Sequence, residues 1–227
     1  MDDEENNVAP IGVYNFDPSK YKKGAYRLIT AVDALVQLHG RFLVHKFEEC
    51  TRKTKINSVQ FDWPGCAFSL CFRQSKVVEI RLKGEGNYFN VFLDGQFQCI
   101  LQASLNATCY RIVEFENDAD VDMEHIVTIT KRTEPQMRGA MSTFKVCTFY
   151  GFLVDSEAQV LPCNIQFDHK IEFIGDSDTC AFGNEGQSSS ANAIFGMKGR
   201  MENVYNGYAS ITARMFNADH HILAWSG

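Results

Sequence analysis

The chain has 227 residues, of which 45% are hydrophobic and 22% charged, and its formal net charge at pH 7 is −6. This length suits one large domain or two modest ones, and the composition is typical of a globular protein. No apolar run approaches the ~20 residues of a membrane-spanning helix. No stretch concentrates positive charge either, so the sequence argues against a membrane or a nucleic acid as a partner.

The first 39 residues are predicted to form an N-terminal arm and a lead-in to the first domain. Up to about residue 25 the chain shows little periodicity. It begins Met1-Asp2-Asp3-Glu4-Glu5, which is acidic where a secretory signal would be basic, so we expect a cytoplasmic location. Between Leu28 and Leu38 apolar residues recur at helical spacing, but a short helical turn that leads into a strand fits equally well.

Residues 40–160 are predicted to form a β-sandwich, because short alternating runs rich in aromatic and β-branched residues are broken by turns about every ten positions. Asp94-Gly95, between two apolar runs, is a strong hairpin signal. The expected strands are Arg41–Lys46, Ser58–Asp62, Ala67–Arg73, Val77–Leu82, Tyr88–Leu93, Phe97–Leu101, Tyr110–Glu116, Ile126–Arg132 and Phe144–Val154.

The eight cysteines are scattered and form no CxxC pair, which argues against a zinc site. Several lie inside apolar strand-like runs. We expect them to be mainly reduced, buried, small hydrophobic residues. No metal and no cofactor is predicted.

Residues 161–227 are predicted to form an α/β unit. A strand at Lys170–Ile174 leads into Gly175-Asp176-Ser177, and a Gly- and Ser-rich loop follows over residues 183–199. Apolar residues from Val204 to Met215 share one helical face, and Ile222–Trp225 is typical of a buried strand. This is one βαβ unit.

The segment around Ser177 resembles the nucleophile block of carbohydrate esterase family two, whose hydrolase domain is of the SGNH or GDSL type. The resemblance is carried by residues 171–180 together with Gly183-Asn184-Glu185-Gly186. Further similar fragments follow the family's order: Gly40-Arg41, Phe61–Gly65, Asn87–Val91 with Leu93–Gly95, Lys131–Glu134, Gly151-Phe152, Glu202-Asn203, Tyr208, Thr212–Arg214, His221-Ile222 and Ala224–Gly227.

The resemblance implies a jelly-roll domain followed by the first part of an SGNH hydrolase domain that removes acetyl groups from sugars. It implies that Ser177 is the nucleophile, beside Asp176, and that Gly227 contributes to the oxyanion hole. Asn184 and Glu185 are the expected substrate-binding residues. An acetylated carbohydrate is the implied substrate.

Several departures from the family pattern lead us to expect catalytic incompleteness. The family's Asn-bearing block and DxxH block lie C-terminal to the sequence given. One literal DxxH, Asp122-Met123-Glu124-His125, is predicted at the entrance of a sandwich strand without a catalytic role. Asp178 follows the nucleophile where an apolar residue is usual, and Ala181 replaces a customary glycine. His220 and His221 are predicted to be solvated surface residues just before the last strand.

A non-catalytic cytosolic structural or interaction protein is the alternative function. A lone βαβ unit leaves apolar strand edges and faces in water. We therefore expect residues 165–227 either to dock on the jelly roll and on a protein partner that buries Ile222 and Trp225, or to belong to a larger domain. Jelly rolls also carry binding surfaces. Trp63, Tyr88 and Phe89 are candidates to stack on a sugar, although buried aromatic residues are commoner in a sandwich.

Overall fold

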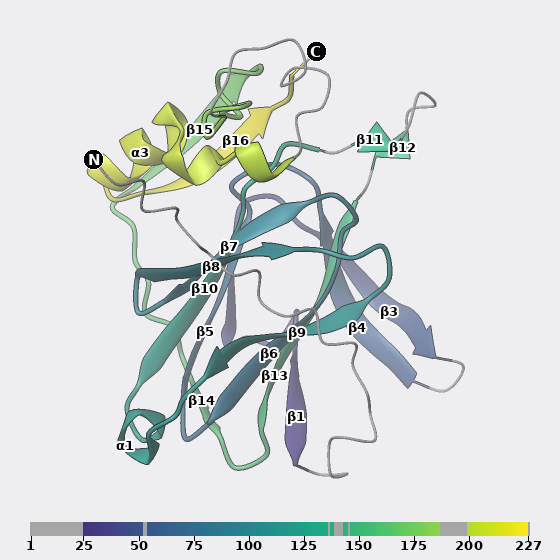
Figure 1. Cartoon of the computed structure of the whole chain (residues 1–227), viewed down its shortest axis with the longest axis vertical. Coiled ribbons are helices and arrows are strands. Elements are labelled where there is room, and N and C mark those ends of the chain that lie inside the picture. Colours follow the sequence, from purple (N-terminus) through teal and green to yellow (C-terminus); the bar gives the residue numbers. More distant parts are fainter. Residues whose placement is uncertain are drawn as a thin grey trace, which may run out of the picture.

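Two six-stranded antiparallel sheets make up most of the structure, a computed structural model that describes residues 25–51, 54–135, 137–138, 143–144, 146–186 and 199–226 (Figure 1). The first sheet has the order β3 (Leu43–Thr51), β4 (Thr54–Phe61), β13 (Cys147–Asp155), β6 (Val77–Lys83) and β9 (Thr108–Glu114), with β1 (Tyr26–Thr30) paired to β13. The second has the order β14 (Gln159–Leu161), β5 (Ala67–Arg73), β10 (His125–Lys131), β7 (Tyr88–Leu93) and β8 (Gln96–Gln102), with β2 (Val36–His39) paired to β5.

Aromatic side chains fill the space between the two sheets. Phe68 of β5 stacks on Phe149 of β13 with ring centroids 4.0 Å apart, and the edge of Phe152 packs against Phe149 at 5.2 Å. Because side chains alternate along a strand, Leu70 and Phe72 join Phe68 in the core. On the other face of β5, Ser69 shares a 2.8 Å hydrogen bond with Thr128 of β10. The predicted jelly-roll β-sandwich is confirmed.

The lead-in before residue 40 is part of the sandwich, and of the two predicted possibilities it fits the short turn that leads into a strand. Residues 26–30 and 36–39 form strands β1 and β2, and each pairs with a strand of the sandwich. The apolar residues at helical spacing pack into this sheet structure instead: Ile29 is buried and Leu38 packs against the core. The sandwich therefore starts at Tyr26, earlier than the predicted boundary. Strand β1 forms by pairing with β13, which lies more than 100 residues away in the sequence. Residues 1–24, where the arm was predicted, lie outside the described residues.

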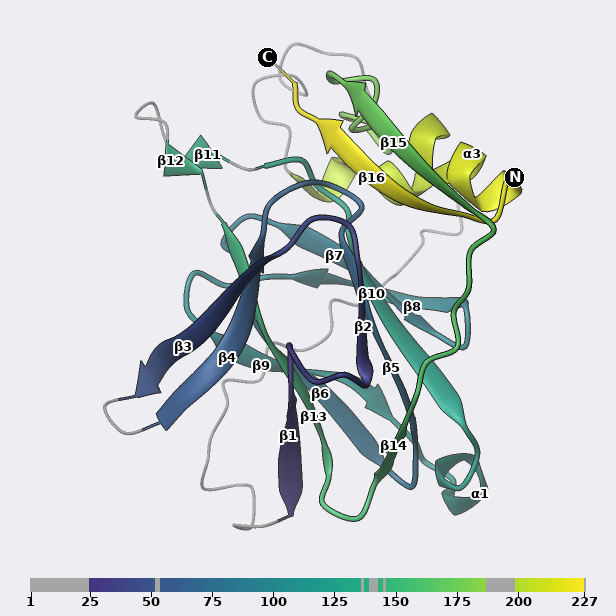
Figure 2. The ribbon, with the colours of Figure 1, turned by 180° about the vertical axis from the view of Figure 1, so that it is seen from behind.

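A parallel βαβ unit follows the sandwich, as predicted. Strands β15 (His169–Gly175) and β16 (Ala218–Ala224) pair in parallel, and helix α3 (Tyr208–Met215) packs against β16 (Figures 1 and 2). The 3-10 helices η2 (Gly199–Met201) and η3 (Val204–Asn206) precede α3. A small core joins Cys180, Val204, Ala209, Ile222 and Ala224. Short helix α1 (Asp118–Val121) and the small pair β11 (Met137–Arg138) and β12 (Thr143–Phe144) complete the described elements.

Strand β16 is longer than predicted, and this corrects the placement of two histidines. His220 and His221 lie inside the strand and are half-buried, whereas they were expected on the surface before it. Ile222 is only 2% exposed within the chain itself, so no partner is needed to bury it. Its side chain lies close to Gly65 of the jelly roll, where an added Cβ would come within 3.2 Å of Ile222 Cδ1.

Cysteines take the places expected of small hydrophobic residues. Five of those described, Cys66, Cys99, Cys109, Cys147 and Cys180, are buried, and Cys71 and Cys163 are half-buried. None of these seven is in a disulfide. Of the helices in the described ranges, none has the length and apolar character to cross a membrane.

Candidate active site

Ser177 lies in a tight turn directly after the carboxyl end of β15. The turn is closed by backbone hydrogen bonds from Cys180 N to Asp176 O at 3.0 Å and from Phe182 N to Ser177 O at 2.9 Å. Gly175 is required at its start, because a Cβ there would lie 2.1 Å from Thr179 Oγ1. The strand therefore ends on a residue without a side chain and the serine follows, half-buried, at the sheet edge where open α/β sheets bind ligands.

The side chains that flank Ser177 face solvent. Asp176 and Asp178 are both exposed, and the Asp178 backbone N–H donates to Asp176 Oδ1 at 3.2 Å. Solvent and salt screen an exposed carboxylate, so Asp178 opposes negative charge at Ser177 only weakly. Ala181 has φ +61°, a left-handed conformation that explains why glycine is customary at this position in the family that the sequence resembles.

The end of β16 brings a second loop to the same sheet edge. Gly175 pairs with Ala224 in the parallel register, so the two strands end side by side. Ser177 and Ser226 each stand two residues beyond that pair. Gly227, the predicted oxyanion donor, lies outside the described residues, but the segment that leads to it starts beside the Ser177 turn.

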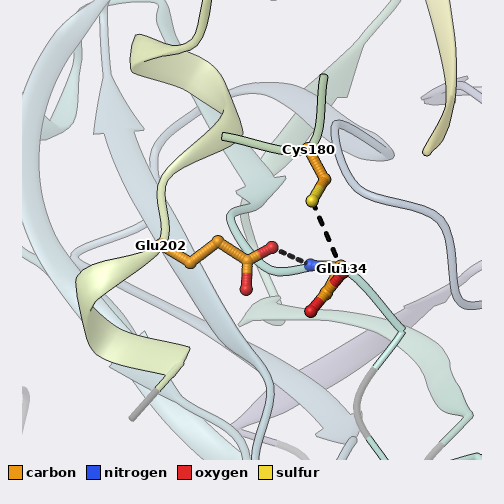
Figure 3. A group of neighbouring side chains, drawn as sticks. All are labelled: Glu134, Cys180 and Glu202. Atoms are coloured by element: carbon orange, nitrogen blue, oxygen red, sulfur yellow. Dashed lines mark hydrogen bonds between the residues drawn. The ribbon is translucent and has the colours of Figure 1, made fainter. Parts of the chain in front are cut away.

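Glu134, in the loop after jelly-roll strand β10, connects these two loops, and Figure 3 shows its bond to Cys180 in the first of them. Its Oε2 accepts hydrogen bonds from the Ser226 backbone N–H at 2.6 Å and from the Cys180 thiol at 3.4 Å, and its Oε1 accepts from Ser226 Oγ at 2.5 Å. The carboxylate of Glu202 accepts the backbone N–H of Glu134. We call Glu134, Cys180 and Glu202 the Glu134 cluster.

Burial governs the proton affinity of the Glu134 cluster. Burial is the largest cause that raises the pKa of Glu202 to about 8, and the charge of Glu134 adds to it. Burial also raises the pKa of the Cys180 thiol, again with a contribution from Glu134. One ligand atom from each residue lies within 4.8 Å of the others, a spacing that a metal ion could use. In this structure, however, Glu134 and the Cys180 thiol are engaged with protein donors and acceptors, so the cluster acts as a hydrogen-bonded support.

The predicted substrate-binding residues Asn184 and Glu185 join a polar network between the sandwich and the βαβ unit. The Asn184 side chain bonds the backbone of Asn203 in both directions, at 2.9 and 3.0 Å. Glu185 accepts from Arg132, which is 1% exposed, and from Asn203 Nδ2 at 2.6 Å. Arg132 also donates to Asn90 Oδ1 of β7 at 2.7 Å. The structure thus gives both residues a structural role, and substrate binding by them stays a prediction.

Comparison with known proteins identifies the family of this chain. Residues 51–163 match the family described as "Carbohydrate esterase 2 N-terminal". Cellulase/esterase CelE of Acetivibrio thermocellus is 34% identical over 172 residues, which make up 75% of this chain and 19% of that protein. The chain belongs to carbohydrate esterase family two.

Two further comparisons define how much of such a protein the chain spans. Acetylxylan esterase / glucomannan deacetylase of Cellvibrio japonicus is 25% identical over 172 residues, which cover 75% of this chain and 42% of that protein. The solved structure of a family two carbohydrate esterase from Cellvibrio japonicus superposes with a TM-score of 0.71 at 20% identity, covering 89% of this chain and 53% of that one. At this identity the superposition shows a shared fold. The chain spans less than half the length of the curated relatives that it matches.

None of the histidines whose side chains the structure describes contacts Ser177. His125, from the literal DxxH, begins β10 as predicted, and its ring nitrogens bond Asp94 Oδ2 and Asp120 O, each at 2.7 Å. Both views place the neighbouring helix α1 at the end of the sandwich away from β15 (Figures 1 and 2). His220 shares a 3.3 Å contact with Ser210 Oγ.

The jelly-roll aromatics divide between core and surface. Phe89 is completely buried and is therefore unable to stack on a sugar. Tyr88 is half-buried, and Trp63 packs against the core while it lines an open groove with Arg41, Gln60 and Asp62. Burial raises the pKa of Asp62 in this groove to about 6. Trp63 and Tyr88 therefore keep some access for stacking, and Phe89 has none.

Sequence reasoning missed Glu134, Glu202 and Arg132 as residues of the site. Two fragments that carry the family resemblance, Lys131–Glu134 and Glu202-Asn203, contain all three. These fragments supported the resemblance, but the sequence alone assigned no role to their residues. Only the folded chain shows that these fragments meet the nucleophile turn and its neighbouring loops.

Proposed function

We propose that this chain carries the jelly roll and the nucleophile segment of a serine-dependent carbohydrate O-acetyl esterase. The observation that carries the proposal is the position of Ser177, in a glycine-preceded turn at the carboxyl end of β15 and beside the loop after β16. A hydroxyl presented in such a turn, next to backbone N–H donors, is the arrangement that acyl transfer requires.

The reaction would proceed in two steps. Ser177 Oγ attacks the acetyl carbonyl carbon, and the negative charge that develops on the carbonyl oxygen is stabilised by the N–H groups of Ser177 and of the segment after β16. Collapse of the intermediate releases the sugar hydroxyl and leaves the acetyl group on Ser177. Water then hydrolyses this ester to acetate and regenerates the serine. A base must accept the Ser177 proton as Oγ attacks and return it to the departing sugar oxygen.

Acetylated carbohydrate is the substrate class that we propose. The names of the relatives support it, because CelE is a cellulase/esterase and the Cellvibrio japonicus protein an acetylxylan esterase and glucomannan deacetylase. Trp63 and the polar residues of its groove give the jelly roll a surface on which a sugar ring can stack.

The test is acetate release from acetylated xylan oligosaccharides and from 4-nitrophenyl acetate. We expect Ser177→Ala to reduce the rate to the uncatalysed level. Ser156→Ala is the matched control, because Ser156 lies in the turn after β13 and its hydroxyl, within the described part of the chain, donates to Glu157 Oε1 alone at 3.4 Å. This variant should keep the full rate. A wild-type rate equal to that of Ser177→Ala would refute the enzymatic function.

A second candidate is a non-catalytic interaction protein in the cytoplasm, and the exposed apolar surface of the βαβ unit favours it. Ile174 at the end of β15 is 76% exposed and Met215 at the end of α3 is 80% exposed, while Phe216 and Trp225 also face solvent. A specific partner would cover an area on the order of 1,000 Å² or more.

Light scattering tests this second candidate. We expect the wild-type chain to associate with itself or with a co-purified partner, and Ile174→Ser with Met215→Gln to abolish that association. A wild-type protein that is monomeric and active with Ser177 would contradict it.

A further inference from the structure

Glu134 belongs to the jelly roll by sequence, but its carboxylate is directed at the loops of the βαβ unit (Figure 3). The residue follows β10 by three positions and is 6% exposed. Its carboxylate contacts Ser226, 92 residues further along the chain, and Cys180, 46 residues along. A buried carboxylate is expensive to desolvate, so its hydrogen bonds to these loops are strong constraints on their position.

The backbone of Glu134 is itself held from two sides. The carboxylate of Glu202, which follows η2, accepts the Glu134 N–H. The completely buried Lys131 donates its ammonium group to the Glu134 carbonyl at 3.0 Å. Because its N–H and its carbonyl are both hydrogen-bonded, the backbone of Glu134 is held in place, and its carboxylate reaches Ser226 from a fixed position.

The two loops that Glu134 joins are those of the proposed chemistry. At Ser226 the carboxylate accepts both the backbone N–H and the hydroxyl, which fixes the orientation of the Trp225–Ser226 peptide in the loop after β16. At Cys180 it accepts the thiol, whose sulfur also lies 3.4 Å from the carbonyl oxygen of Ser177. One side chain therefore spans from the nucleophile turn to the segment with the predicted oxyanion donor.

We propose that Glu134 is a positioning residue that sets the distance between the Ser177 turn and the loop after β16. The jelly roll is then a structural part of the catalytic site rather than a separate binding module. The inference rests on the proposed function, since it assigns Glu134 to the same serine site. Displacing a donor by about 1 Å is enough to cost on the order of 100-fold in rate, so this support matters even though Glu134 touches no substrate.

The experiment compares Glu134→Gln with the wild type by residue-resolved amide hydrogen exchange and by kinetics. Glutamine keeps the shape but presents one acceptor oxygen in place of two and removes the charge. We expect the Ser226 amide to exchange at least tenfold faster, the Ser177 turn to loosen, and the strands β5 and β10 to remain unchanged. With 4-nitrophenyl acetate we expect kcat to fall at least tenfold while KM is unchanged. Glu124→Gln, an exposed carboxylate on the opposite end of the sandwich, is the control and should change neither measurement.

The outcomes separate this inference from the proposed function. Unchanged exchange at Ser226 overturns the inference, as does faster exchange spread evenly over the whole sandwich. A Ser177-dependent activity whose kcat survives Glu134→Gln also overturns it. A wild-type rate equal to that of Ser177→Ala refutes the proposed function alone; local loosening at Ser226 would then still support Glu134 as the residue that positions these two loops.

Discussion

Arg132 provides the most demanding test of the contact between the sandwich and the βαβ unit. Its guanidinium is 1% exposed and donates to Asn90 Oδ1 at 2.7 Å, to the Arg200 carbonyl at 3.0 Å and to the Glu185 carboxylate. Burial is the main cause that lowers the Arg132 pKa, and the charge of Glu185 opposes it. We predict that Arg132→Ala strongly destabilises the protein.

The magnitude follows from the groups that lose their donor. Asn90 Oδ1 is left buried without its donor, which costs about 1–3 kcal/mol. Glu185 is 32% exposed, so water replaces part of its lost ion pair and the loss there is about 1 kcal/mol. The packing of the Arg132 stem adds to this, and the total is about 3–5 kcal/mol, the range for breaking a buried pair. For a protein of this size that corresponds to a fall in Tm of about 10 °C.

The assay is urea unfolding followed by circular dichroism, with a matched surface arginine as control. The Arg73 side chain is 40% exposed, lies 3.9 Å from Glu124 and donates to Gln159 Oε1 at 2.8 Å, so Arg73→Ala should lower the free energy of unfolding by only about 1 kcal/mol. The double variant Arg132→Ala with Glu185→Gln should cost less than the sum of the two single variants, because the unpaired carboxylate is gone. An Arg132→Ala variant as stable as Arg73→Ala would refute the reasoning.

Two further predictions concern stability. The raised pKa means that Glu202 keeps its proton in the folded protein up to pH about 8, whereas the unfolded chain releases it near pH 4.5. The stability that this proton contributes is therefore full below pH 4.5 and is lost as the pH rises through about 8. In urea unfolding at pH 5–8, Glu202→Gln should reduce the fall of the unfolding free energy with pH by up to roughly 1.4 kcal/mol per pH unit. An unchanged slope would contradict the assignment. Gly151 has φ +139°, and an added Cβ would lie 2.1 Å from Ile29 O, so Gly151→Ala should lower the free energy of unfolding by about 4 kcal/mol or prevent folding. Gly95→Ala is the control: nothing lies within 4 Å of its added Cβ, and the loss should be about 1 kcal/mol. A Gly151→Ala protein that melts within 2 °C of the wild type would count against this explanation.

The central strands could be predicted from the sequence because each carries its own signal. The run Ala67–Arg73 places Phe68, Leu70 and Phe72 on one face, and the structure has the strand at the predicted residues. Tyr88–Leu93 is likewise a strand at its predicted bounds. Period-two alternation between turn residues is a local property, so a single sequence displays it. The nucleophile turn is local for the same reason, since Gly175 and Thr179 lie four residues apart.

The assignments that failed were those that depend on distant segments. Strand β1 is decided by pairing with β13, and the helical spacing of Leu28 and its neighbours carries no information about that partner. His220 is half-buried because β16 begins at Ala218 and faces the jelly roll, a packing that its neighbours in sequence do not reveal.

The sequence by itself determined the jelly roll, the parallel βαβ unit, the family and the position of Ser177, because short-range periodicity and contiguous motifs specify all of them. Only the tertiary structure decided that Asn184 and Glu185 join the polar network around Arg132, and that Glu134 supports the nucleophile turn. These contacts join residues between 18 and 92 positions apart. The hydrogen-bond partner of a buried polar group depends on which loops the folded sheets bring together, and these loops are far apart in the sequence.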